Sequence, residues 1–237
     1  MDTIGNQKFN SFEKNKTYRT EHFPKLDVVV NLDYFEQKDC NDILKIVNNN
    51  LDIDFDIDHI LYEISNCKDD KKDQRFFIKI KPEVVDTETK KIIDLIKNPK
   101  PEEVIGDFKN KKVRYHFAGV LNEIILSKKI RELVASDMFQ RLAKKYGFAG
   151  MKFAEPISAL IDKEQHKKYL IYKNLELIDG MFPDDDSEIF IDNLREIFLQ
   201  NNIFPNDLNI RQFIVTQENG KYYIVLIDIE AYTNIKK

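Results

Sequence analysis

The chain has 237 residues, and its 37 basic and 41 acidic side chains give a formal net charge of −4, which argues against a general nucleic-acid-binding protein. Hydrophobic residues make up 42% of the sequence, enough for a packed core, yet no apolar run approaches the roughly 18 residues that span a bilayer. The two cysteines, Cys40 and Cys67, show no pairing signal, which fits a reducing compartment or a secreted protein that makes no use of disulfides. The polar N-terminus has no signal-peptide core, so a cytoplasmic protein is expected.

The region before residue 70 carries apolar patterns but no assignable motif. A run of valines predicts a strand over residues 26–33, and apolar residues at helical spacing predict a helix over residues 42–49. Residues 51–59 alternate aspartates with apolar residues. This alternation predicts an edge strand with a solvated face rather than a calcium site, because an EF-hand loop needs a central Gly and a final Glu. We expect this region to complete a sheet and to supply a surface for a protein partner.

Two further strands are predicted over residues 60–64 and 75–80. In the second strand, Lys79 shares one face with Phe77, and apolar residues form the other face. No glycine occurs between residues 6 and 105, so no glycine-rich loop precedes Lys79.

A helix is predicted over residues 86–97, followed by a polar connection over residues 99–112. A short strand over residues 113–117 contains Arg114 and His116.

The clearest helical pattern covers residues 121–146, where Ser127 is a candidate start of a separate helix and Gly147 is the expected end. An apolar strand follows over residues 168–172, and then a short polar segment. A further amphipathic helix, with aspartates before its N-terminus, begins at Ser187.

The stretch from residue 202 to residue 232 combines a polar turn with a strand hairpin. Asp207 lies in the turn, strands are predicted over residues 213–216 and 222–227, and Asp228 follows the second strand. Carboxylates that flank a hairpin can converge, which suits one as a general base and the other as a ligand of a hard cation.

This stretch resembles the catalytic loop and metal-binding segment of the protein-kinase-like superfamily, with its pattern HxDxxxxN, a strand hairpin and then D-F-G. In small-molecule members, such as aminoglycoside and choline phosphotransferases, the last triplet often ends in Glu, as Asp228-Ile229-Glu230 does here. The family His is Pro205 in this chain. The family Asn, which holds a second metal, is Gln212.

The resemblance implies that Asp207 is the catalytic base and that Asp228 and Gln212 are ligands of magnesium. It also implies that a strand lysine contacts the phosphates of ATP and that a helix glutamate orients this lysine. Lys79 is the first candidate for the phosphate contact, with Arg114 and His116 as alternatives. For the glutamate, the first candidate is Glu132 and the second is Glu123. The linker whose backbone would bind adenine is Lys173, Asn174 and Leu175.

The expected fold is α+β, in two lobes of the protein-kinase-like kind. Residues 1–172 would form a sheet lobe with added N-terminal elements, and residues 173–237 a minimal C-terminal lobe. The chain ends soon after Glu230, as in the minimal kinases found among bacterial effectors, so delivery into a host cell is an alternative location. The expected function is ATP- and magnesium-dependent phosphotransfer. The alternatives are a pseudokinase that acts as a binding module, and an unrelated α+β interaction protein.

Overall fold

The computed structural model describes residues 18–51, 55–68, 74–82, 120–165, 167–175, 178, 187–206, 208–229 and 232–234. The chain divides into two compact units: Met1–Glu83 with Glu155–Asn174, and Val84–Ala154 with Leu175–Lys237. The expected division into two lobes, with a boundary after residue 172, stays a prediction; in the compact units residues 84–154 group with the C-terminal part. Helices and mainly antiparallel sheets occur together in the described residues, which confirms the α+β class.

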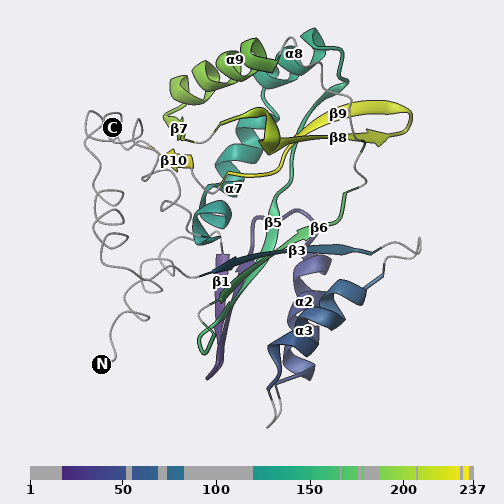
Figure 1. The fold of residues 1–237 in the computed structure, drawn as a ribbon, viewed down its shortest axis with the longest axis vertical. Helices are drawn as coiled ribbons and strands as arrows, with labels where there is room; N and C mark the ends of the chain where they lie inside the picture. Colours follow the sequence, from purple (N-terminus) through teal and green to yellow (C-terminus); the bar gives the residue numbers. More distant parts are fainter. Residues whose placement is uncertain are drawn as a thin grey trace. The chain divides into compact units, whose positions relative to one another are not determined.

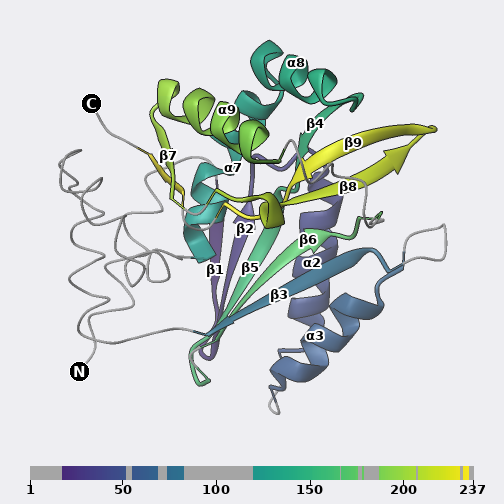
Figure 2. The same cartoon turned by 45° about the horizontal axis from the view of Figure 1, so that its top comes forward.

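The first unit is built on a five-stranded antiparallel sheet with the strand order β1-β2-β5-β6-β3 (Figure 2). Its strands are β1 (Tyr18–His22), β2 (Leu26–Asn31), β5 (Pro156–Asp162), β6 (Lys167–Lys173) and β3 (Phe76–Pro82). The strands predicted near residues 26–33, 75–80 and 168–172 are therefore confirmed. The β1–β2 hairpin joins the sheet through β5, so it lies at the opposite end of the sheet from β3.

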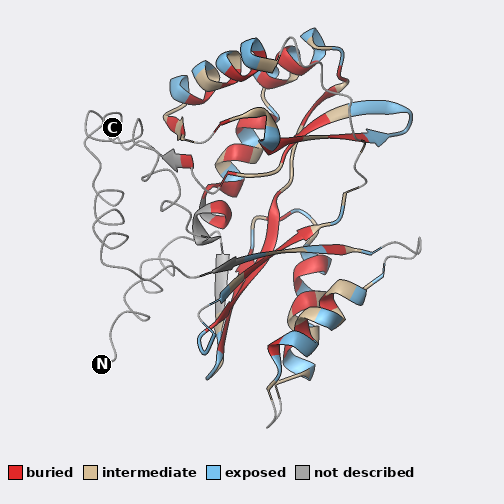
Figure 3. Ribbon diagram, in the orientation of Figure 1, coloured by how far each residue is buried: buried red, intermediate tan, exposed pale blue. Residues whose placement is uncertain are grey.

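Two helices, α2 (Gln37–Asn49) and α3 (Ile57–Asn66), pack against one face of this sheet (Figures 1 and 3). Alternate strand residues such as Val28 and Phe76 meet helix residues such as Ile43 and Ile60, and all four are 0% exposed. The period of two along the strands and the spacing of three or four along the helices place these side chains in one core. Each such burial contributes about 1.5–3 kcal/mol.

The strands predicted over residues 51–59 and 60–64 are wrong wherever the structure describes these residues. Residues 57–66 form α3, in which Ile57, Ile60 and Ile64 are buried. Asp56 caps the helix, because its carboxylate accepts a hydrogen bond of 2.9 Å from the backbone N–H of Asp58. Asp56 thus belongs to the alternating pattern of the sequence, but in the structure it is the N-terminal cap of α3, a position that aspartate favours.

Arg75, just before β3, joins this strand to α2. Its guanidinium donates to Asp42 Oδ2 at 2.8 Å and also to Asp39. The Arg75 side chain is 10% exposed and that of Asp39 only 2%. Burial acts to lower the pKa of Arg75, but hydrogen bonds to Asp39 and Asp42 outweigh it and raise that pKa above its ordinary value. The contact is thus a buried pairing of charges.

The two cysteines should differ sharply in reactivity. Burial, assisted by the charge of Asp39, raises the pKa of the Cys40 thiol to about 12, whereas Cys67 is half-exposed. Because the thiolate is the reactive form, we expect a thiol reagent at about pH 8 to modify one cysteine in the folded protein and both in denaturant. Rapid modification of two thiols in the folded protein would contradict the burial of Cys40.

The second unit contains a three-stranded sheet, a two-stranded sheet and three described helices. The helices are α7 (Val120–Val134), α8 (Asp137–Lys145) and α9 (Ser187–Gln200). The larger sheet has β4 (Gly150–Phe153) parallel to β9 (Lys221–Leu226), and β9 antiparallel to β8 (Phe213–Glu218). The smaller sheet pairs β7 (Ile203–Pro205) with β10 (Tyr232–Asn234). One turn of 3₁₀ helix, η2 (Ile210–Gln212), precedes β8.

The predicted hairpin and the predicted helix from Ser187 are confirmed as β8–β9 and α9. The hairpin turns through Asn219 and Gly220, which have φ values of 50° and 73°. These angles suit Asn and Gly, the residues that most readily adopt positive φ in tight hairpins. The helical pattern over residues 121–146 is two helices, and Ser127 lies inside the first; the break falls near Ser136.

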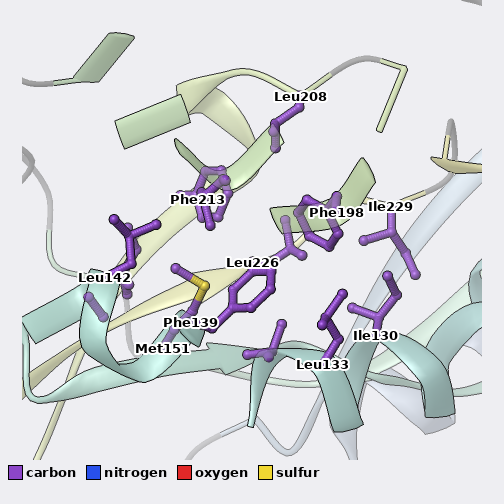
Figure 4. Close-up of a cluster of buried hydrophobic side chains, with 14 of the residues drawn as sticks. Ile130, Leu133, Phe139, Leu142, Met151, Phe198, Leu208, Phe213, Leu226 and Ile229 are labelled. Atoms are coloured by element: carbon purple, nitrogen blue, oxygen red, sulfur yellow. The ribbon is translucent and has the colours of Figure 1, made fainter. Parts of the chain in front are cut away.

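A single apolar cluster holds the second unit together (Figure 4). The Phe139 and Phe198 rings meet edge to face with centroids 5.1 Å apart, and both are 0% exposed. Two loop residues, Leu208 and Ile229, belong to the same cluster. They anchor the chain immediately beside the positions of the two predicted site carboxylates.

Gln140 on α8 ties the helices to β4. Its Nε2 donates to the backbone oxygens of Val134 at 2.7 Å and Met151 at 2.8 Å, and its Oε1 accepts from the Met151 N–H at 3.2 Å. A Cβ at Gly150 would overlap Gln140 Oε1. Glycine at this position therefore makes room for the glutamine.

Several predicted elements lie outside the described residues. These are the helix over residues 86–97, the connection over residues 99–112 and the strand over residues 113–117, with Arg114 and His116. Among the described helices, none is long and apolar enough to cross a membrane.

Candidate functional site

The candidate site lies at the end of the β8–β9 hairpin. Gln212 immediately precedes β8, and Ile227 separates Asp228 from the end of β9. The Ile227 N–H donates to the Gln212 backbone oxygen at 2.9 Å, which extends the pairing of the two strands by one hydrogen bond. The structure thus brings Gln212 and the segment that carries Asp228 side by side, while Asp207 and Glu230 lie outside the described residues.

The loop before β8 has a defined backbone. The Asn209 side chain accepts from the Arg211 N–H at 3.0 Å, and the Gln212 N–H donates to the Asn209 backbone oxygen at 3.1 Å. Asn209 thus caps the N-terminus of the short helix η2 with its side-chain oxygen, a position that asparagine favours. Leu208, buried in the apolar cluster, fixes the other end of this loop.

The two predicted metal ligands differ in their surroundings. Asp228 is half-exposed, and its carboxylate is the type of ligand that magnesium prefers. Gln212 is 6% exposed, and its Oε1 accepts a hydrogen bond of 3.1 Å from the hydroxyl of Tyr232. Magnesium usually retains several waters, and a buried, engaged amide leaves little room for them. Asp228 therefore has the ligand type that magnesium prefers, whereas Gln212 is buried and already hydrogen-bonded, and both metal assignments stay predictions.

Among the residues that the structure describes, no cluster of three or more His, Cys, Asp and Glu side chains is arranged to hold a metal ion. The predicted set includes Asp207, which is not among these residues.

Two residues of the predicted linker make contacts within the first unit. Lys173 Nζ lies 2.6 and 2.7 Å from the carboxylate oxygens of Glu36. The Asn174 N–H donates to the Arg75 backbone oxygen at 2.9 Å, and its side chain donates to the Gln74 oxygen at 3.0 Å. The division between the two units falls directly after Asn174. Lys173 and Asn174 thus extend the sheet, and Leu175 begins the second unit.

The predicted lysine–glutamate pair is divided between the units. Lys79 lies on β3 opposite Leu170 and is half-exposed, on the face expected from the strand pattern. Both glutamate candidates are on α7, where Glu132 is exposed and Glu123 is 1% exposed. Contact between Lys79 and either glutamate stays a prediction.

Tyr232 is the site residue that the sequence interpretation missed. It is 1% exposed, and its hydroxyl is the group that engages Gln212. A buried tyrosine usually finds a hydrogen-bond partner for its hydroxyl. A hydrogen bond from the tyrosine that follows the Asp228-Ile229-Glu230 triplet could therefore have been predicted from the sequence. The spacing gives no reason, however, to choose Gln212 as the acceptor.

Comparisons with models of known families, with curated proteins and with solved structures found no match to this chain.

Proposed function

We propose that this chain is an ATP- and magnesium-dependent phosphotransferase of the protein-kinase-like kind. The observation that carries the proposal is the hydrogen bond between Ile227 and Gln212, which joins the end of the polar loop to the segment containing Asp228. The protein-kinase-like pattern requires such a meeting, because its loop and its metal-binding triplet act on the same phosphates.

The order of the described elements supports the same proposal. The strand β3 with Lys79 comes first, followed by the helices α7 and α8, the strands β4, β5 and β6, and the linker. The helix α9, the loop, the β8–β9 hairpin and Asp228 then follow in the order that the resemblance implies. The turn of the β1–β2 hairpin contains no glycine, so the proposal assigns the phosphate contact to another segment.

In the proposed reaction each residue has a limited role. Asp228 would hold magnesium, which neutralises charge on the phosphates when bound. Asp207 orients the acceptor hydroxyl and accepts its proton, and Lys79 binds phosphate oxygens. Glu123 or Glu132 orients Lys79. The linker of Lys173, Asn174 and Leu175 would bind adenine through its backbone, although the Asn174 N–H is already engaged with the Arg75 oxygen.

The second candidate function is nucleotide binding without transfer, as in a pseudokinase. It is favoured by one specific observation: the Gln212 amide oxygen, at the position of the family's second metal ligand, is buried and accepts a hydrogen bond from the Tyr232 hydroxyl. Incubation of the full chain with magnesium and γ-labelled ATP, with mixed small-molecule and protein acceptors, separates the two functions. Transfer or hydrolysis that is lost in Asp207→Asn supports the enzyme, whereas binding without turnover supports the pseudokinase. Absence of nucleotide binding contradicts both.

Replacing Asp228 with Ala should abolish the magnesium-dependent part of nucleotide binding while leaving the fold intact, because the carboxylate is half-exposed. At a ligand concentration about 100-fold above Kd, bound nucleotide stabilises the protein by about 2.7 kcal/mol. For a chain of this size that corresponds to a rise in Tm of about 5–10 °C, which the variant should lose. Thermal unfolding with and without magnesium-ATP measures this difference.

The matched control is Asp192→Ala, which removes an exposed carboxylate from α9. It should keep the full nucleotide-dependent rise in Tm. An equal rise in Asp228→Ala would remove Asp228 from the site.

A further inference from the structure

The hydrogen bond between Tyr232 and Gln212 connects the two ends of the candidate site. The residues are separated by 20 positions, and the contact is buried. Gln212 is fixed at three points: its N–H by Asn209, its backbone oxygen by Ile227 and its side-chain oxygen by Tyr232. The orientation of this amide is therefore set by the protein itself.

Tyr232 is held as firmly as its partner. It opens β10 opposite Pro205 in β7, and its own N–H donates to the Ile229 oxygen at 3.0 Å. Its ring meets that of Phe198 edge to face, with centroids 5.2 Å apart. Both sides of the hydrogen bond thus come from elements packed into the apolar cluster of the second unit.

The same bond links the two positions at which this sequence departs from the family pattern. Pro205 has no side-chain donor and no N–H, so it can only accept hydrogen bonds, through its backbone oxygen. Gln212 is one methylene longer than the Asn it replaces, and its amide reaches Tyr232, the residue paired with Pro205. The two departures therefore form one arrangement around Tyr232.

We propose that Gln212 and Tyr232 are positioning residues, and that the site consequently takes one divalent cation, at Asp228, instead of two. The Gln212–Tyr232 hydrogen bond ties the loop that precedes β8 to the chain that follows Asp228. The number of bound cations rests on the proposed function, whereas the hydrogen bond between Gln212 and Tyr232 is a property of the folded chain alone.

Counting bound manganese tests the first part. The full chain with a non-hydrolysable ATP analogue is titrated with Mn²⁺, and bound metal is followed by electron paramagnetic resonance. We expect one ion per chain in the wild type, one ion bound more weakly in Gln212→Met, in which the amide no longer holds the loop to Tyr232, and none in Asp228→Ala. A purely structural defect would not produce this pattern. Two ions in the wild type, with one lost in Gln212→Met, would overturn the single-cation inference. No bound ion in the wild type would overturn it together with the proposed function.

A double-mutant cycle tests the tie without nucleotide or metal. Tyr232→Phe removes the hydroxyl and leaves a buried amide unsatisfied, which should lower Tm by about 3–8 °C. In the Gln212→Met background, which keeps the length of the side chain, the same change should lower Tm by far less. Additive effects would overturn the positioning role even if one cation binds.

Tyr222→Phe is the matched control, because Tyr222 is 36% exposed on β9. Its Tm should stay within about 1 °C of the wild type. If Gln212→Met does not fold, Gln212→Leu takes its place in both experiments, since it also removes the acceptor. A loss of stability in Tyr222→Phe as large as in Tyr232→Phe would count against the buried hydrogen bond.

Discussion

Replacing Arg75 with Met should destabilise the first unit by about 3–5 kcal/mol, because a buried ion pair that loses one partner leaves an uncompensated charge. Here two carboxylates, Asp39 and Asp42, share the guanidinium, and the Asp39 side chain is only 2% exposed. Urea unfolding followed by circular dichroism measures the loss of free energy.

The same substitution at Arg195 provides the control. Arg195 pairs with Asp192 on α9, but its side chain is 43% exposed and that of Asp192 is 73% exposed. An exposed pair of this kind contributes about 0.2–1 kcal/mol. Equal losses at the two arginines would show that the Arg75 contact is not buried in solution. Adding Asp39→Asn to Arg75→Met should recover part of the stability, because it removes a stranded charge.

Gly150→Ala should destabilise the second unit by about 2–4 kcal/mol. The new methyl group overlaps Gln140 Oε1, and the glutamine cannot move without releasing buried backbone groups of Val134 and Met151. Each buried group left unsatisfied costs about 1–3 kcal/mol. The gain of about 0.4–1 kcal/mol from a stiffer unfolded chain offsets only part of this loss.

The clash is specific to the pair, so a second substitution should remove it. In a Gln140→Ala background, Gly150→Ala should be neutral or slightly stabilising, and the coupling between the two positions is read from the double-mutant cycle. Gly220→Ala serves as a comparison, because a Cβ there meets nothing within 4 Å and only its φ of +73° opposes alanine. Additivity at positions 140 and 150 would exclude a steric cause.

Local patterns were sufficient for the elements that combine clear periodicity with a turn signal. The β8–β9 hairpin, with Asn219-Gly220 at its tip, and the helix α9 were predicted correctly in type and place. Apolar spacing is a poorer guide to the face that each helix buries. The apolar spacing of α8 includes Met138 and that of α9 includes Ile189, yet these residues are 44% and 56% exposed. Periodicity defines an apolar stripe, but the neighbouring elements decide how wide a stripe is covered.

The α3 region failed for a related reason. Four aspartates alternating with apolar residues satisfy a strand pattern, and only the tertiary contacts of Ile57, Ile60 and Ile64 with the sheet show the helix. Short apolar segments are ambiguous between strand and helix when periodicity is the sole signal.

Within the candidate site, chain order was easier to predict than side-chain partners. The position of Asp228 just after a strand follows directly from the pattern of β9. The engagement of Gln212 by Tyr232 does not, because it depends on how β10 returns to pair with β7. The resemblance places Glu132 ahead of Glu123, and this order stays a prediction; Glu123 is the buried carboxylate of α7.

The pairing of β2 with β5 has a consequence for how the chain acquires its fold. The Ser158 hydroxyl donates to the Val29 backbone oxygen across 129 positions of sequence. Contacts of such separation slow folding, because the entropy of closing the intervening chain is lost before pairing stabilises the sheet. During synthesis, β1, β2, α2, α3 and β3 leave the ribosome long before β5 and β6. The strands β5 and β6, which join β2 to β3 in the sheet, are therefore the last strands of the first unit to be made. Until then β2 lacks its partner β5 and β3 lacks its partner β6, and unpaired strand edges of this kind favour aggregation, against which chaperones act.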